Sequence, residues 1–185
     1  MPLSGPATQL VPATLEALAT QFFQDSAGDW HSQRRYYSLD DGETQEVTSL
    51  LTVRFVTADS PELAQLAALH HLDPAEAFVC GSQVTWESTY VGSAKKPLTG
   101  STLFGVRGNV LYRDRGFATS KPVTATFYFP NPRTMGLHTE YNNSSFDEEL
   151  KLIGKQYRTR QTIIARAGQA QAIGQYLEKR LCCWD

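Results

Sequence analysis

The feature that most constrains the fold of this chain is a repeated alternation of apolar and polar residues, interrupted by short turn sequences. Alternation with a period of two places every second side chain on one face of a β-strand. Turn signals such as Asp41-Gly42 and Asn142-Asn143 separate the predicted strands. One face carries Val47, Ser49, Leu51, Val53 and Phe55, and the pattern returns over residues 78–90, 104–112, 123–129, 134–141, 145–153, 157–167 and 170–181. The chain is therefore predicted to be mainly β.

Two helices are predicted as well. Residues 13–24 form the first, because apolar side chains recur there with helical spacing. A second, short helix is predicted from about residue 60 to residue 71. It begins with Ser60-Pro61-Glu62, which supplies a cap, a proline at the first helical position and an acid in the first turn.

About nine or ten sequential strands with short connections avoid exposed edges most simply by closing into an up-and-down antiparallel barrel. The predicted fold class is a lipocalin-like β-barrel with an N-terminal α-helix and a short second helix. A barrel of this strand number encloses space for one small ligand. The chain of 185 residues fits one domain. We expect residues 1–11 to be a disordered lead and residues 12–185 to form that domain.

Composition argues against two kinds of partner. A net charge of −2 and a pI near 6.1 give no electrostatic reason to expect nucleic acid. No apolar run approaches the roughly 20 residues of a transmembrane helix, and no signal peptide opens the sequence. The cytoplasm is therefore the expected compartment.

Cysteine and histidine spacing predicts no metal site, and we expect no prosthetic group. Cys80, Cys182 and Cys183 are an odd set without metal-ligand spacing. They are interpreted as reduced thiols, with the alternative that one of them transiently holds a reactive ligand. The pair His70-His71 is expected on the surface, because adjacent helical side chains diverge.

Charged residues alternate along the last third of the chain. The faces concerned carry Glu148 on one predicted strand, Arg158, Arg160 and Thr162 on the next, and Tyr176 and Glu178 on the last. If these faces point inward, two arginines and two carboxylates share one cavity, where they need partners or a ligand. If they point outward, the charges are solvated and pair across strands. The periodicity is compatible with both arrangements.

The segment from Ser26 to Val47 combines aromatic and cationic residues in one predicted strand. Gly28-Asp29-Trp30 matches a lipocalin-type pattern in which the indole closes the barrel floor. Trp86 has no such structural reason and is the better candidate for a ligand contact. Arg34 and Arg35 are adjacent and point to opposite faces, so at most one of them lines the cavity.

Together these segments resemble the CpcS/CpeS family of phycobiliprotein lyases, from about residue 22 to residue 181. The resemblance is carried by Trp30-x-Ser32-Gln33-Arg34, Val84-Thr85-Trp86-Glu87, Phe146-x-Glu148-Glu149, Arg158-x-Arg160 and Glu178-x-Arg180. The family fold is a lipocalin-like barrel with an N-terminal helix. The resemblance also favours the inward orientation of the arginine faces.

The resemblance implies an enzyme that binds a linear tetrapyrrole, such as phycocyanobilin or phycoerythrobilin. The bilin is the substrate, and a thioether bond joins it to a cysteine of an apo-phycobiliprotein. Glu178, and after it Glu148, are expected to polarise or protonate the pyrrole system. The residues expected to bind the ligand are Arg158, Arg160, Trp86, Tyr176, Thr162 and Arg34.

Two alternatives share the predicted fold. One is a lipocalin-like carrier that binds an apolar ligand without chemistry. The other is a non-catalytic subunit of a heteromeric bilin lyase, whose surface binds a sibling. The expected partners are thus a bilin, the acceptor subunit, and a second copy or a sibling lyase subunit.

Overall fold

The computed structural model describes residues 12–94 and 96–181 of the chain. Within these residues the chain forms two α-helices, one short 3-10 helix and ten β-strands. The helices are α1 (Pro12–Ser26), α2 (Pro61–Leu69) and η1 (Pro74–Glu76). The strands are β1 (Gly28–Ser38), β2 (Thr44–Thr57), β3 (Cys80–Tyr90), β4 (Leu98–Arg107), β5 (Val110–Arg113), β6 (Val123–Asn131), β7 (Thr134–Tyr141), β8 (Ser144–Ile153), β9 (Tyr157–Arg166) and β10 (Gln169–Arg180).

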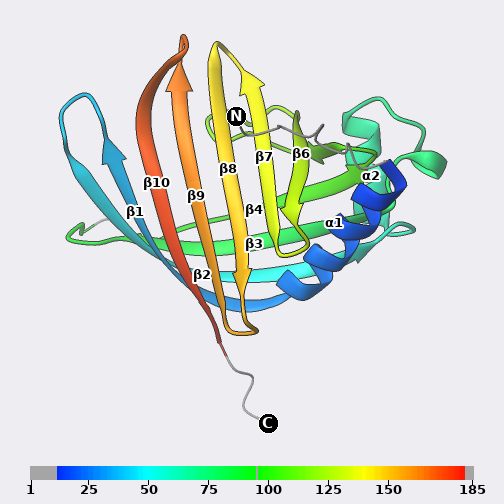
Figure 1. The fold of residues 1–185 in the computed structure, drawn as a ribbon, viewed down its shortest axis with the longest axis horizontal. Coiled ribbons are helices and arrows are strands. Elements are labelled where there is room, and N and C mark those ends of the chain that lie inside the picture. The colour runs from blue at the N-terminus through cyan, green and yellow to red at the C-terminus, as the bar shows by residue number, and fades with distance from the viewer. Residues whose placement is uncertain (1–11, 95, 182–185) are drawn as a thin grey trace, which may run out of the picture.

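The strands form a closed antiparallel barrel in which sequence neighbours are also spatial neighbours (Figure 1). Closure comes from β1, which pairs with β2 on one side and with β10 on the other. The predicted fold class, a mainly β up-and-down barrel with an N-terminal helix and a short second helix, is confirmed. Closure leaves the described strands without a free edge, which removes a route to aggregation.

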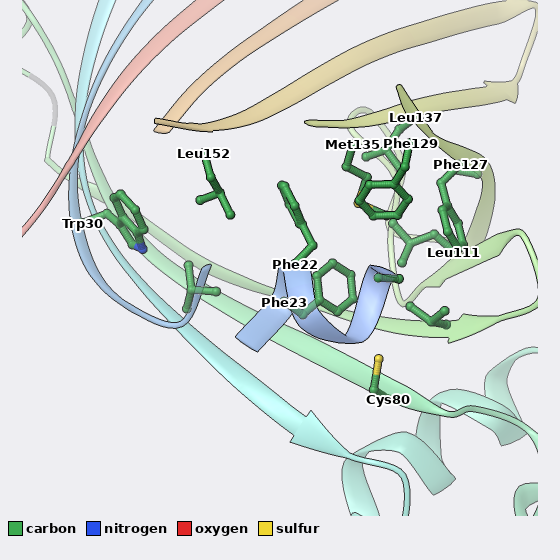
Figure 2. Close-up of a cluster of buried hydrophobic side chains, with 14 residues drawn as sticks. Phe22, Phe23, Trp30, Cys80, Leu111, Phe127, Phe129, Met135, Leu137 and Leu152 are labelled. Atoms are coloured by element: carbon green, nitrogen blue, oxygen red, sulfur yellow. The ribbon is translucent and has the colours of Figure 1, made fainter. Parts of the chain in front are cut away.

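Helix α1 closes one end of the barrel through the predicted apolar stripe. Ala19, Phe22 and Phe23 are buried and belong to a cluster with inward-facing residues of β1 to β8. Figure 2 shows Phe22 and Phe23 among Trp30, Leu152, Met135 and other labelled side chains of the strands. Gly28, the first residue of β1, has a φ of +132°, and a Cβ there would lie 2.6 Å from the Arg180 guanidinium.

Helix α2 lies outside the barrel and forms a second apolar cluster. Ser60 caps it as predicted, accepting a hydrogen bond from the backbone N–H of Leu63 at 3.2 Å. Leu63 and Leu66 are buried against a group that includes Leu103, which points outward from β4. The expectation that both histidines lie on the surface was wrong for His70. That ring is half-buried against Tyr112, and its Nε2 lies 2.9 Å from the carbonyl oxygen of Arg113.

The strand predicted over residues 104–112 is instead a hairpin. Strand β4 ends at Arg107 and β5 begins at Val110, and Arg107 pairs directly with Val110. The turn contains Gly108, whose φ of +61° is readily adopted by glycine. The two-residue turn shifts which residues face inward, so Val106 and Leu111 share a face, whereas Tyr112 points outward to Phe78.

The remaining sequence predictions concern the N-terminal lead, the cysteines, membrane helices and metal sites. The lead at 1–11 and the cysteines Cys182 and Cys183 lie outside the described residues. Cys80 is buried, and its Sγ accepts a hydrogen bond from the Thr20 hydroxyl at 3.3 Å. Within the described part of the chain, no helix has the length and apolar character needed to cross a membrane. No cluster of metal-ligand side chains occurs in that part either.

Candidate functional site

The barrel encloses a cavity of about 560 Å³ between α1 and the loop at 114–122. This volume falls in the range of roughly 300–1,000 Å³ that is typical of small-ligand pockets. Apolar side chains such as Phe22, Val84 and Leu111 line one part of it. Charged side chains from β1, β5, β8, β9 and β10 line the remainder.

The register of β1, β10 and β9 arranges the polar lining in rows across the strands. The floor row, nearest α1, consists of Ser32, Glu178 and Arg158. The middle row consists of Arg34, Tyr176 and Arg160. The upper row, toward the loop, consists of Tyr36, Gly174, Thr162 and, on β8, Glu148. The inward orientation of Arg158 and Arg160 is therefore observed.

The floor row is a buried ion pair. Arg158 Nε donates to Glu178 Oε2, and the two side chains are 7% and 1% exposed. The Ser32 hydroxyl donates to Glu178 Oε1 at 3.2 Å. Trp30 lies beneath the row, as expected for a floor residue, fully buried with its Nε1–H donating to the Ser26 carbonyl at 2.9 Å. The Arg158 guanidinium lies 4.9 Å from the centre of the indole.

The middle row places a cation among hydroxyl groups. Arg34 points inward and donates to Ser88 Oγ at 2.7 Å and to Ser49 Oγ, with no carboxylate partner among the described residues. Its neighbour Arg35 points outward and pairs with Glu46, so Arg34 is the cavity residue of the two. Burial raises the pKa of Tyr176, although the nearby arginines oppose this shift. Its hydroxyl therefore stays protonated at physiological pH.

The upper row brings one carboxylate to two arginines. Arg160 Nη2 donates to Glu148 Oε2, and Arg113 Nη1 lies 3.6 Å from Glu148 Oε1. Burial disfavours the charged form of Arg160, but the electrostatic interactions with Glu148, Tyr176 and Glu178 and the hydrogen bond to Glu148 together outweigh this and raise the arginine's pKa. For Arg113 the effect of burial dominates and lowers the pKa. Both groups nevertheless remain cationic near neutral pH.

Trp86 and Thr162 differ in how they meet the cavity. Trp86 lines it from β3, and its indole covers Gly100, where a Cβ would lie 2.5 Å from the ring. Thr162 is on the same inward face but is 1% exposed, and it is not among the residues that line the described cavity. Its side chain lies in the upper row beside Glu148, which does line the cavity. Of these two residues, only Trp86 is among those that line the described cavity.

An aromatic stack holds the loop at 114–122 over the upper end of the cavity. Phe117 and Tyr141 each stack on Phe146, with ring centres 4.7 Å and 5.0 Å apart. The backbone N–H of Ala118 donates to the Tyr141 hydroxyl at 2.9 Å. Phe117 therefore covers the lumen while remaining 37% exposed.

The charges of the lining do not cancel. Besides the exposed Arg115, four arginines that line the cavity are buried or half-buried, namely Arg34, Arg113, Arg158 and Arg160. They face two carboxylates, Glu148 and Glu178. Three of the arginines keep a buried Nε without a hydrogen-bond partner in the described structure, namely Arg34, Arg113 and Arg160. The arrangement therefore suits a ligand with two negative charges.

Arg113 and Phe117 were missed by the sequence prediction. The error at Gly108 grouped Tyr112 on one strand face with Phe104 and Val106 and left Arg113 on the other face. The sequence Arg107-Gly108-Asn109-Val110 contained the signal, because Gly-Asn between two strand-like runs is typical of a two-residue hairpin. Phe117 lies in a loop without periodicity, and no pattern indicated that it would cover the lumen.

Comparisons with known proteins agree with this architecture. The CpeS-like protein family matches residues 19–181. A Nostoc sp. protein provisionally named phycocyanobilin lyase CpcS 2 is 57% identical over 174 residues, covering 94% of this chain and 97% of the relative. A Picosynechococcus sp. protein provisionally named chromophore lyase CpcV is 53% identical over 170 residues, covering 91% and 84%.

A solved structure, the S-type phycobiliprotein lyase CpeS from Guillardia theta, shares the fold with a TM-score of 0.75. It is 21% identical in sequence, and the match covers 90% of this chain and 94% of that one. The family match spans the barrel, α2, the C-terminal part of α1 from residue 19 and all the charged rows described above. The chain belongs to the CpeS-like protein family.

Proposed function

We propose that this protein is a phycobiliprotein chromophore lyase, which binds a linear tetrapyrrole and attaches it to a cysteine of an apo-phycobiliprotein. The observation that carries the proposal is the excess of arginines over carboxylates in the barrel cavity of about 560 Å³. A bilin has two propionates, which match the two uncompensated cations. The names of the cyanobacterial relatives support the same activity, and the name of the Nostoc relative favours phycocyanobilin.

The other features of a bilin also match the lining. Its conjugated plane suits Trp86 and Tyr176, because aromatic faces stack on flat π systems. Its pyrrole N–H groups need acceptors, and a carboxylate that accepts them favours the protonated pigment. Glu148 and Glu178 are the carboxylates that line the cavity.

The reaction needs no nucleophile from this chain. The acceptor's cysteine thiolate adds to the exocyclic double bond of the bilin's first ring, forming one C–S bond and breaking the π bond. The electron pair enters the conjugated system, a proton is added at a ring carbon, and no group leaves. The lyase holds the bilin in one geometry and relays to the ring carbon the proton that the acceptor's thiol releases, which are contributions of positioning and general acid–base catalysis.

The contacts favour Glu148 over Glu178 for the proton-handling role, which reverses the order expected from the sequence. Both oxygens of Glu178 have donors, from Ser32 and Arg158, at the floor. Glu148 Oε1 has no hydrogen-bond partner in the described structure and lies 3.6 Å from Arg113. Glu148 therefore keeps an acceptor position for the ligand, whereas Glu178 orients Arg158.

The direct test is transfer of phycocyanobilin by the purified protein to an apo-phycobiliprotein, followed by a denaturing gel that detects covalently bound pigment. We expect an adduct that forms faster and more uniformly than in the protein's absence. Binding without transfer would identify a carrier, and transfer that requires a co-expressed sibling would identify a subunit of a heteromeric lyase.

Matched variants then separate the carboxylates. Glu148→Gln is expected to lower the transfer rate at saturating bilin, while Glu178→Gln mainly weakens bilin binding by disturbing Arg158. Unchanged transfer by folded Glu148→Gln would refute its assignment.

We place the reaction in the cytoplasm, where the acceptor's cysteine is kept reduced.

A further inference from the structure

We propose that Arg113 binds one carboxylate of the bilin, and that the cavity uses it to distinguish a bilin with free propionates from its esters. The inference rests on the proposed function, because it concerns the ligand of the same cavity. It adds a residue from β5, outside the strands that carry the predicted arginines.

Arg113 is a buried cation with incomplete pairing. It is 5% exposed, and its Nε has no hydrogen-bond partner within the described residues. The separation of 3.6 Å between its Nη1 and Glu148 Oε1 is too long for a good hydrogen bond. A buried guanidinium that lacks acceptors is costly unless a ligand supplies them.

Glu148 does not complete this pairing, because it is shared. Its Oε2 already accepts from Arg160, so one carboxylate serves two guanidiniums. A guanidinium has five N–H donors and binds a carboxylate through two parallel bonds. Arg113 thus keeps the donor capacity that one further carboxylate would use.

Aromatic rings hold this donor group at the upper end of the cavity. The Arg113 Cζ lies 5.1 Å from the ring centre of Phe104 and 4.6 Å from that of Phe117. Arg34, which has no carboxylate partner in the described residues, lies on β1, which is separated from β5 by β2, β3 and β4. The two uncompensated cations therefore stand on different walls, as a ligand with two separated carboxylates requires.

The test is a titration of the parent and of Arg113→Gln with phycocyanobilin and with its dimethyl ester, followed by visible absorption. Arg107→Gln is the matched control, because Arg107 is exposed on β4 of the same hairpin. We expect Arg113→Gln to lose about 10-fold or more in affinity for the free acid, as for one charge-assisted bond. Its affinity for the ester should change less than about 3-fold, and Arg107→Gln should match the parent with both ligands.

Each outcome is decisive. If the parent binds neither ligand, the proposed function fails. If the parent binds acid and ester equally, or if Arg113→Gln keeps the parent's preference for the acid, the bilin assignment stands and the role of Arg113 is overturned. Unchanged ester binding shows that a variant is folded. If Arg113→Gln does not fold, Arg113→Lys serves, because lysine keeps the charge but lacks the two parallel donors. Its loss must again be confined to the free acid.

Discussion

The floor ion pair, Arg158 with Glu178, allows a quantitative test of how much an unpaired buried charge destabilises the barrel. Glu178→Gln removes the negative partner of Arg158, whose side chain is 7% exposed. Breaking a buried pair by removing one partner costs about 3–5 kcal/mol, because the remaining charge stays buried. The indole of Trp30, 4.9 Å from the Arg158 guanidinium, retains a cation–π contact of about 0.5–2 kcal/mol. This contact is present in both the parent and the variant and does not reduce the difference, so we expect a loss of about 3–5 kcal/mol in the free energy of unfolding.

The assay is urea unfolding followed by far-UV circular dichroism, with the slope m checked for constancy. Glu46→Gln is the matched control, because it breaks the Arg35–Glu46 pair on the outer face, where the side chains are 52% and 45% exposed. No measurable change is expected there, since exposed ion pairs contribute little.

The double variant Arg158→Met/Glu178→Leu separates the cost of an orphaned charge from the value of the pair. Apolar side chains of similar volume replace a buried ion pair with little loss, and often with a gain. We expect the double variant to be more stable than Glu178→Gln. If Glu178→Gln costs no more than Glu46→Gln, the floor pair is hydrated and its description as a buried ion pair is wrong.

Three further predictions concern other parts of the molecule. Phe117→Ala removes the stack on Phe146, an aromatic pair that is worth about 0.5–1.5 kcal/mol. Bilin dissociation, measured by stopped-flow absorption, should therefore become about 2- to 10-fold faster. An unchanged dissociation rate would show that the loop does not retain the ligand. The hydrogen bond to Asp147 raises the pKa of His138, so this contact stabilises the fold below pH ~6.5 and is lost as the pH rises through the folded-state pKa. Urea unfolding of His138→Gln should therefore show a deficit at pH 5.5 that shrinks by pH 8.5, and a constant deficit would contradict it. Burial raises the pKa of Cys80, so peptide mass spectrometry should find it alkylated by iodoacetamide at pH 8 only after unfolding, and rapid labelling of the native protein would show an accessible thiol.

The barrel could be predicted from the sequence because the patterns that indicate it are local. Alternation fixes which side chains share a face, and closure follows from the need to remove edges. The α1 stripe and the Ser60 cap depend on neighbouring residues as well, and the structure contains both. None of these features requires knowledge of which strands are opposite one another.

The orientation of the charged faces could not be predicted from periodicity. The alternation in β9 and β10 shows which residues share a face, but not which face points inward. On β10, Leu177 is 49% exposed while Glu178 is 1% exposed, the reverse of a simple hydrophobicity rule. The physical reason is cooperative: Glu178 is stable inside because Ser32 and Arg158 stand opposite it. A single strand carries no information about such partners.

Arg113 shows how one missed turn loses a site residue. Two residues of turn between Arg107 and Val110 exchange the inward and outward faces, so the error changed every assignment on β5. The contact between Arg113 and Glu148 also joins strands that are not adjacent in the barrel. Only closure of the barrel brings them together, and no sequence spacing encodes it.

The division of the cavity into a charged wall and an apolar wall explains why the helices are needed. The rows on β1, β9 and β10 place charged side chains at inward positions where apolar side chains could otherwise be buried. Ion pairs in such a position contribute specificity more than stability. Stability must then come from elsewhere, and α1 supplies it by burying Phe22 and Phe23 against the opposite strands, as Figure 2 shows. The outer cluster under α2 adds burial that does not compete with the lumen. Because the apolar contacts of α1 and α2 stabilise the fold, the charged wall can be complementary to a ligand without having to supply that stability.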